Sequence, residues 1–328
     1  MTGKLLLLMI MIGSISCQSQ TKGKMKEAKM NPLLCDTTTG ICEVPGGNNV
    51  ATATNIKTGI KPIKIIYYTD PICSSCWGIE PQLRKLKLEY GEYIDIDYRM
   101  GGLLPDWSYN SGGISKPSDV AHHWKEVSRY YEMPIEGDVW LTDPLHSSYP
   151  PSIAMKAAQM QDKTKALIFL RKLRERIFLD NKNITRWEVI QEAASYAGLD
   201  TTQLKPDYEG PAKQLFEEDL QYARTLGVRG FPTLFVSAAG KQPVTIYGFR
   251  PYDVFESAVK QLLPDARKES INTAPLALFN HYPTLTVKEY AVLTGTTNAV
   301  AATLLDKLVA ANKLKKQTVS SGSIYSLQ

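Results

Sequence analysis

The chain has 328 residues, of which 43% are apolar and 22% charged, and its formal net charge is +5 at pH 7. Such a chain can bury at least one full-sized core, and its length allows two or three domains. Part of the positive charge is grouped in lysines at 22–29 and 313–316. This modest surplus gives no argument for nucleic-acid binding.

The first residues have the pattern of an export signal. Lys4 precedes an apolar run at 5–12, which is too short to span a bilayer stably, and small residues follow before Cys17. The arrangement resembles a bacterial lipoprotein signal, which implies a lipidated Cys17, although Ser14 stands where an aliphatic residue is usual. We expect 1–17 to be this signal and the protein to be lipid-anchored in the cell envelope, on the periplasmic side of a membrane. Ordinary secretion and an uncleaved anchor are the alternatives.

Residues 18–60 are polar and poor in aromatic side chains, which predicts a flexible tether. The tether contains Cys35 and Cys42 in the sequence CDTTTGIC. Three roles are open for them: a structural disulfide, electron exchange with a second cysteine pair further along the chain, or metal binding and free thiols. If Cys17 carries lipid, four cysteines remain, and an even number in an exported chain favours disulfide chemistry.

The ordered part of the chain is predicted to be an α/β domain at 61–264. It begins with a buried strand in PIKIIYYTD. A helix follows from Trp77 to a stop at Gly91, and EYIDIDYRM alternates like a half-buried strand, so these elements form a βαβ unit. A helical insertion is predicted at about 115–208. Strands then return in GVRGFPTLFV and VTIYGF, before a last helix in PYDVFESAVKQLL.

A separate module is predicted at 275–328, with two helices and a hairpin that turns at 320–322. Thr286 and Glu289 have the spacing of a capping box at the first of these helices, as Thr185 and Glu188 have in the insertion. The order of elements is winged-helix-like. DNA binding is disfavoured because no arginine occurs after Arg267, so we expect a packing or partner-contact module and no nucleic acid partner.

The strongest chemical signal is the pair Cys73 and Cys76, in C-x-x-C at a predicted strand-to-helix junction. At the start of a helix, unpaired backbone N–H groups favour the thiolate of Cys73, which would attack a disulfide. Cys76, one turn later, would resolve the mixed disulfide and is expected to be the more buried of the two. A structural disulfide and a zinc site are weaker alternatives, and we expect no metal or cofactor.

Asp70 lies three residues before Cys73. It can cap the following turn, or relay a proton to Cys76 if it is buried.

Five motifs occur in an order that resembles the DsbA-like branch of the thioredoxin superfamily, and within it the FrnE and SpxH-type proteins. They are DPICSSCWGIEP, HHWKEV, SSYPPSIAMKAAQ, NITRWEV and GVRGFPTLFV, and the similarity covers about Lys61 to Leu263. The resemblance implies a thioredoxin fold interrupted by a helical insertion. It also implies that Pro232 is in cis beside the cysteine pair and that the backbone of Phe231 holds a substrate strand.

Further expectations concern substrates and the direction of electron flow. Thr233 and Trp77 are expected to contact substrate together with Phe231. The dipeptide between the cysteines is Ser74-Ser75, whereas relatives with oxidant activity usually carry proline with histidine or tryptophan. Oxidant, reductant and isomerase activity therefore all remain open.

The sequence thus favours a thiol-disulfide oxidoreductase that acts on protein cysteines and works with a redox partner protein. The alternative is a non-catalytic protease adaptor or redox sensor of SpxH type.

Overall fold

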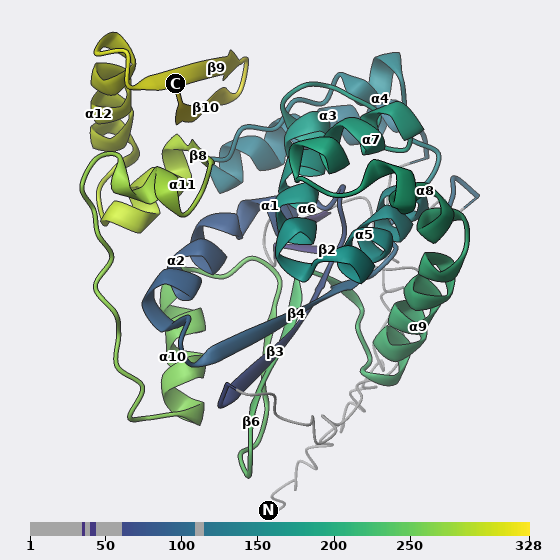
Figure 1. The fold of residues 1–328 in the computed structure, drawn as a ribbon, viewed down its shortest axis with the longest axis horizontal. Helices are drawn as coiled ribbons and strands as arrows, with labels where there is room; N and C mark the ends of the chain where they lie inside the picture. The colour runs from purple at the N-terminus through teal and green to yellow at the C-terminus, as the bar shows by residue number, and fades with distance from the viewer. Residues whose placement is uncertain (1–34, 37–39, 44–60, 109–114) are drawn as a thin grey trace, which may run out of the picture.

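The computed structural model describes residues 35–36, 40–43, 61–108 and 115–328, with residues 35, 36 and 43 described by their backbone. Its centre is a four-stranded sheet in the order β4-β3-β6-β7 (Figure 1). β3 is parallel to β4, whereas β6 is antiparallel to both β3 and β7. The strands are β3 (Ile63–Thr69), β4 (Ile94–Met100), β6 (Thr233–Ala238) and β7 (Val244–Tyr247). This is the thioredoxin-like arrangement that the sequence predicted.

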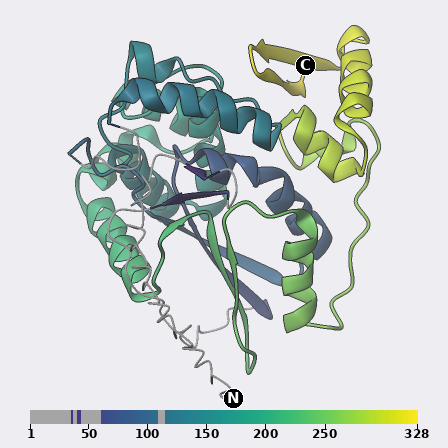
Figure 2. The ribbon, with the colours of Figure 1, turned by 180° about the vertical axis from the view of Figure 1, so that it is seen from behind.

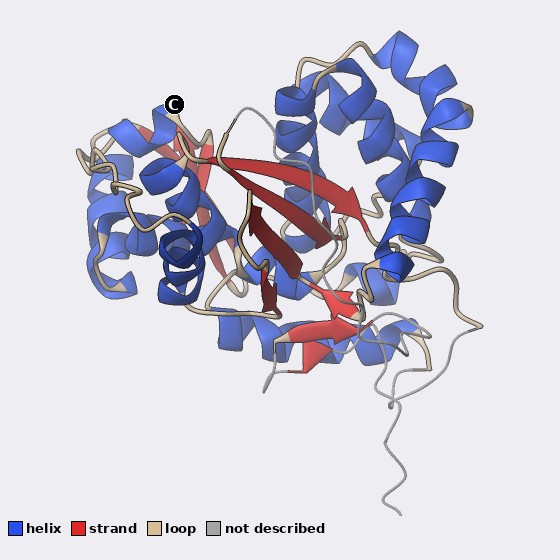
Figure 3. Cartoon of the chain, turned by 90° about the horizontal axis from the view of Figure 1, so that it is seen from below, coloured by secondary structure: helices blue, strands red, loops and turns tan. Residues whose placement is uncertain are grey.

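Helices cover both faces of this sheet (Figure 3). α2 (Glu80–Tyr90) and α10 (Tyr252–Leu262) pack against each other on one side, while α5 (Tyr149–Gln161) and α9 (Pro211–Thr225) contact β4. Because it is enclosed in this way, β3 is buried at every position except the half-buried Lys64. A continuous apolar strand is expected in that environment.

The predicted βαβ unit is present, but its helix is divided in two. Ile79 caps both α1 (Ser74–Gly78) at its end and α2 at its start, and Gly91 is the C-cap of α2, where the helix stop was predicted. Pro81 lies in the first turn of α2; its ring cannot donate a hydrogen bond and would clash with the carbonyl of the preceding turn in a continuous helix. The break confines the cysteine pair to a short turn of helix at the end of β3.

The helical insertion packs beside the sheet (Figure 1). Besides α5 it comprises α3 (Pro117–Tyr131), α4 (Val139–Thr142), α6 (Lys163–Phe178), α7 (Trp187–Tyr196) and α8 (Thr201–Glu209). α9 then leads back to the sheet and was not assigned from the sequence. The buried carboxylate of Asp219 fixes α9 to β4, because it accepts hydrogen bonds from Arg99 and Met100 at 2.8 and 3.0 Å and pairs with Lys156 at 2.8 Å.

Part of the predicted tether is ordered, which corrects that prediction. β1 (Cys35–Asp36) pairs with β2 (Ile41–Glu43), and β2 pairs antiparallel with β5 (Gly230–Phe231) to form a small second sheet. Edge pairing of this kind satisfies backbone groups of β5 that would otherwise face solvent. The predicted signal at 1–17, its Cys17 and the rest of the tether lie outside the described residues.

The C-terminal module has a core of its own, formed by residues such as Leu285, Leu305 and Tyr325. An extended connection after α10 leads to it along the side of the molecule (Figures 1 and 2). Its elements are η1 (Ala277–Asn280), β8 (Thr284–Thr286), α11 (Val287–Thr294), α12 (Asn298–Ala310), β9 (Leu314–Val319) and β10 (Gly322–Leu327). The two helices and the hairpin are where the sequence predicted them, and assignment to the winged-helix class stays a prediction.

A buried ion cluster joins this module to the thioredoxin-like domain. Glu289 of α11 is fully buried; it accepts two hydrogen bonds from Arg171 of α6, at 2.7 and 3.1 Å, and lies 3.2 Å from Nε of Arg84 of α2. Burial alone would raise the pKa of Glu289, but the two guanidinium groups hold it below its usual value.

Among the described residues, no helix is long and apolar enough to cross a bilayer.

We predict that Glu289→Gln lowers the free energy of unfolding by about 3 kcal/mol, because Arg171 and Arg84 each lose a buried carboxylate partner and keep only Glu175 and Glu80. Urea denaturation at neutral pH measures the change. Asp306→Asn in α12 is the matched control, since its ion pair with Lys316 is exposed and should contribute less than about 1 kcal/mol. Equal effects of the two substitutions would contradict a stabilising role for the buried cluster.

Candidate functional site

Cys73 and Cys76 form a disulfide at the start of α1. Cys73 is the N-cap residue, and its Sγ accepts a hydrogen bond from the backbone N–H of Cys76 at 3.1 Å. This donor would also stabilise a thiolate on Cys73 after reduction. Both cysteines have 0% exposure, so the expected difference in burial between them is absent.

The Phe231–Pro232 peptide bond is cis, as the resemblance implied. Just before it, β5 pairs with β2 so that Phe231 lies opposite Cys42 and Gly230 opposite Glu43. A side chain at Gly230 would come within 2.5 Å of the carbonyl oxygen of Cys42, so a glycine is needed for this close approach. The backbone edge that was expected to hold a substrate strand is therefore occupied by the chain's own β2.

This pairing brings a third sulfur to the site. The Sγ atoms of Cys42 and Cys73 are 3.6 Å apart, and Cys42 Sγ lies 3.3 Å from the hydroxyl of Ser75. Ser75 in turn bonds the hydroxyl of Tyr131 at 2.6 Å. Cys42 is itself disulfide-bonded and, like the other two, fully buried. Cys42, Cys73 and Cys76, here called the sulfur cluster, thus come together from two predicted pairs.

Asp70 is fully buried and caps the turn before the cysteines. One carboxylate oxygen accepts from the N–H of Ile72 at 3.0 Å, and the other accepts from the N–H of Leu103 at 2.7 Å and the hydroxyl of Ser148 at 2.8 Å. Burial raises its pKa from 3.8 to about 6, and these hydrogen bonds limit the rise. The predicted cap is confirmed, whereas a proton relay to Cys76 stays a prediction.

Three side chains that shape the site were missed in the sequence. Arg174 of α6 is fully buried and donates to the Thr69 hydroxyl at 2.6 Å and to the carbonyl of Asp70 at 3.3 Å, so it fixes the turn that leads to Cys73. Ser148 and Tyr131 also come from the insertion. No local pattern marks these residues, because only the tertiary fold brings the insertion onto the cysteine turn.

Two predicted substrate contacts lie in the interior instead. Trp77 is fully buried: its ring stacks with Phe178, and its Nε1 donates to the carbonyl of Pro134 at 3.1 Å. The side chain of Thr233 is also buried, and its hydroxyl donates to the carbonyl of Gly230 at 2.6 Å. In this structure both side chains stabilise the surroundings of the cysteines, and the contact of Trp77 and Thr233 with a substrate stays a prediction.

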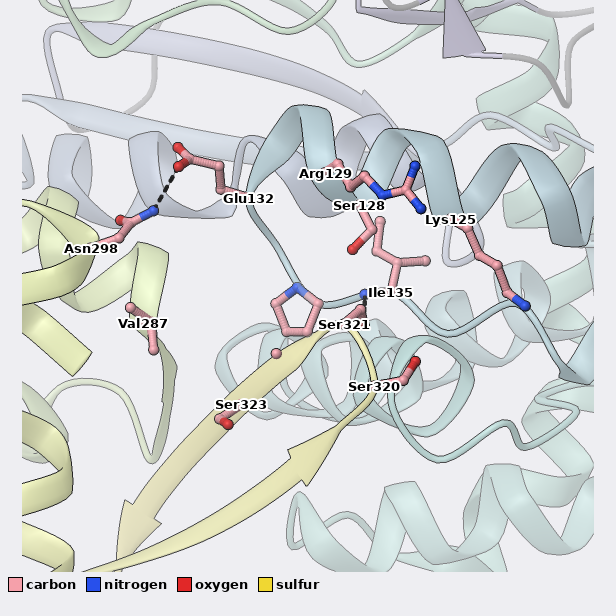
Figure 4. Close-up of a pocket in the computed structure, with 12 residues that line it drawn as sticks. Lys125, Ser128, Arg129, Glu132, Ile135, Val287, Asn298, Ser320, Ser321 and Ser323 are labelled. Carbon is pink, nitrogen blue, oxygen red and sulfur yellow. Dashed lines mark hydrogen bonds between the residues drawn. The ribbon is translucent and has the colours of Figure 1, made fainter. Parts of the chain in front are cut away.

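A separate pocket of about 510 Å³ lies between α3 and the C-terminal hairpin (Figure 4). Its acidic lining residue, Glu132, is already engaged, since it accepts from the amide of Asn298 at 2.9 Å and pairs with Lys288. Ser321 of the hairpin accepts a hydrogen bond from the N–H of Ile135 at 2.9 Å. The pocket is thus a polar junction between the module and α3. Within the described ranges, no cluster of side chains is suited to hold a metal ion.

Comparison with known proteins agrees with this site. The family model described as Thioredoxin matches residues 67–257, which is more than half of the chain. The chain is 33% identical over 272 residues to the ClpXP adapter protein SpxH of Halalkalibacterium halodurans, a match that covers 81% of this chain and 89% of that protein. It is 30% identical over 294 residues to the protein of the same name from Shouchella clausii, covering 89% of this chain and 95% of the relative.

Two solved structures share the fold. One is a candidate protein disulfide isomerase from Nitrosomonas europaea, with a TM-score of 0.53, 19% identity, and coverage of 61% of this chain and 97% of that one. The other is the cytosolic disulfide reductase DsbM from Pseudomonas aeruginosa, with a TM-score of 0.50, 20% identity, and coverage of 60% and 97%. The chain therefore belongs to the thioredoxin family, in the DsbA-like branch that includes the SpxH proteins.

Proposed function

We propose that the protein is a thiol-disulfide oxidoreductase that acts on protein cysteines in the cell envelope. The observation that carries the proposal is the disulfide between Cys73 and Cys76 at the start of α1, in a chain of the thioredoxin family. The backbone edge at Phe231 supports it, since this edge accepts an antiparallel strand. The envelope location rests on the sequence pattern that ends at Cys17.

In the reductive direction, the thiolate of Cys73 attacks one sulfur of a substrate disulfide and the other substrate sulfur leaves as a thiol. Cys76 then attacks Cys73, which releases the second substrate thiol and leaves the Cys73–Cys76 disulfide. Two electrons pass to the substrate. Oxidation of a substrate dithiol follows the same steps in reverse, and a partner protein with a dithiol or disulfide would restore the starting state.

The environment of the pair supports either direction of electron flow. The N–H of Cys76 donates to Cys73 Sγ, which favours the reduced pair by stabilising a thiolate. Burial of both sulfurs acts the other way, since it disfavours a charged sulfur. The chemistry needs no cofactor, because the two cysteines carry both electrons.

A second candidate function is that of an adaptor, and the names of the most similar relatives favour it. An adaptor would present a partner protein to ClpXP and would not need disulfide exchange. Location separates the two functions, because an adaptor for a cytosolic protease has to remain in the cytosol. The cysteines separate them as well, since only the oxidoreductase requires both sulfurs.

We predict that Cys73→Ala lowers the rate of disulfide exchange with a peptide substrate by about 100-fold or more, because it removes the nucleophile. Cys76→Ala should instead accumulate mixed disulfides between Cys73 and substrate proteins. Stopped-flow fluorescence and non-reducing gels measure these outcomes. Unchanged rates in both variants would contradict the proposed oxidoreductase function. Binding to ClpXP that is unaffected by both substitutions would support the adaptor function.

We predict that Asp70→Asn abolishes an inflection near pH 6 in the pH profile of the exchange rate, if Asp70 relays a proton. The folded-state pKa of about 6 lies above 3.8, so the stabilising effect of this carboxyl is present at acidic pH and is lost as the pH rises from about 4 to about 6. The stability of the variant relative to wild type should therefore rise by about 2 kcal/mol over that range. Superimposable rate profiles would leave Asp70 only its role as a cap.

A further inference from the structure

We propose that Cys42 and its disulfide partner form a second redox centre, which exchanges electrons with Cys73 and Cys76 through a mixed disulfide between Cys42 and Cys73. The inference rests on the proposed oxidoreductase function and adds a substrate for it that is part of the same chain. The observation behind it is the position of β2, which is paired with β5 beside the sulfur cluster.

The distance between the sulfurs suits exchange. Cys42 Sγ and Cys73 Sγ lie 3.6 Å apart, without a covalent bond between them. Groups that react in an enzyme are typically held about 3 to 3.5 Å apart before reaction. A shift of a few tenths of an ångström therefore brings the two sulfurs into that range. A disulfide with a purely structural role has no need to contact a third sulfur.

The backbone presents Cys42 as a substrate cysteine would be presented. β2 adds to the edge of β5 as an antiparallel strand, with Cys42 directly opposite Phe231. Strand addition of this kind fixes the register of a bound peptide through main-chain hydrogen bonds. The register at β5 decides which residue faces α1, and here that residue is a cysteine.

The domain has a defined site for β2, here called the seat, where Gly40, Ile41 and Cys42 contact Phe249 and Gly230. The carbonyl of Gly40 accepts a hydrogen bond from the N–H of Phe249 at 2.7 Å, and Ile41 is buried. A Cβ at Gly40 would lie 2.3 Å from Cβ of Phe249, and the residue has a φ of +64°. Gly230 allows the close approach from the other side, because a Cβ there would lie 2.6 Å from Cγ2 of Ile41. Two glycines far apart in the sequence thus make room for one strand.

The partner of Cys42 is assigned from the register. Cys42 is disulfide-bonded, and the residue opposite it in the antiparallel pair of β1 and β2 is Cys35. Directly opposed residues in antiparallel strands have Cα atoms about 4.5 to 5.5 Å apart, within the range of a disulfide. Cys73 and Cys76 are bonded to each other, which leaves Cys35 as the neighbour in register.

The exchange balances within the chain. When the Cys35–Cys42 pair is reduced, the thiolate of Cys42 attacks Cys73 Sγ, the Cys73–Cys76 bond breaks, and Cys76 takes up a proton. Cys35 then attacks Cys42 Sγ, the Cys42–Cys73 bond breaks, and Cys73 takes up the second proton. Two electrons and two protons move from one pair to the other, and the reverse direction uses the same bonds.

The first test traps the mixed disulfide in the full chain with Cys17→Ser in every variant. Cys35→Ser with Cys76→Ser leaves Cys42 and Cys73, and the control, Cys35→Ser with Cys73→Ser, leaves Cys42 and Cys76. After reduction and mild reoxidation with oxidised glutathione, mass spectrometry of peptides should find the Cys42–Cys73 link at least about tenfold above the Cys42–Cys76 link. Equal yields, or no Cys42–Cys73 link, overturn the proposal.

The second test moves β2 without touching a cysteine. Gly40→Val, added to the first trapping variant, should lower the yield of the Cys42–Cys73 link at least about tenfold, because its side chain meets Phe249. Gly240→Val is the matched control: its φ is +68°, and its Cβ would have no neighbour within 4 Å. A similar loss in both variants would indicate general destabilisation and overturn the assignment of the seat.

The two proposals can fail separately, because the link forms inside the chain and needs no external substrate. A protein that exchanges with substrate peptides but forms no Cys42–Cys73 link loses only the second redox centre. If the link forms on reoxidation with glutathione but the protein exchanges with no peptide or protein substrate, the proposed function fails.

Discussion

The pairing of β2 with β5 is the constraint on which the candidate site depends. It places the backbone of Cys42 opposite Phe231 and its sulfur against Cys73, and it leaves every sulfur of the cluster buried. A substrate strand and β2 would need the same edge of β5. In this structure the edge of β5 is therefore already occupied by β2, a segment of the same chain.

Helix α6 holds the other side of this site in place. Two of its arginines, one helical turn apart, reach in different directions: Arg174 to the turn before Cys73, and Arg171 to Glu289 of the C-terminal module. Buried guanidinium groups are costly unless every charge is paired, so both contacts fix the position of α6. The insertion thus connects the cysteine turn with the C-terminal module, which gives that module a structural role independent of nucleic acid.

The sequence predicted the features that depend on neighbouring residues. The position of Cys73 at a helix start, the stop at Gly91 and the capping box of Thr286 and Glu289 all follow from local rules. The same capping pattern at Thr185 failed, because its hydroxyl donates to Asn183 instead and the helix begins later. Local rules do not predict contacts between residues that are far apart in the sequence. A polar segment with two cysteines has the composition of a tether, and only the glycine-lined seat beside β5 orders part of it.

β2 is short, and its length limits the free energy with which it binds the edge of β5. It pairs with β5 over two residues, and Ile41 is its only large buried aliphatic side chain among the described positions. A hydrogen bond contributes about 1 kcal/mol net and a buried isoleucine about 1.5 to 3 kcal/mol, so the gross stabilisation is roughly 3 to 6 kcal/mol. Fixing the backbone of a few residues costs about 1 to 2 kcal/mol each, which offsets much of this gain. The strand is therefore held by a small net free energy. An external strand loses translational and rotational freedom on binding, which β2 does not, so it replaces β2 only if it buries enough additional surface at this edge to offset that cost.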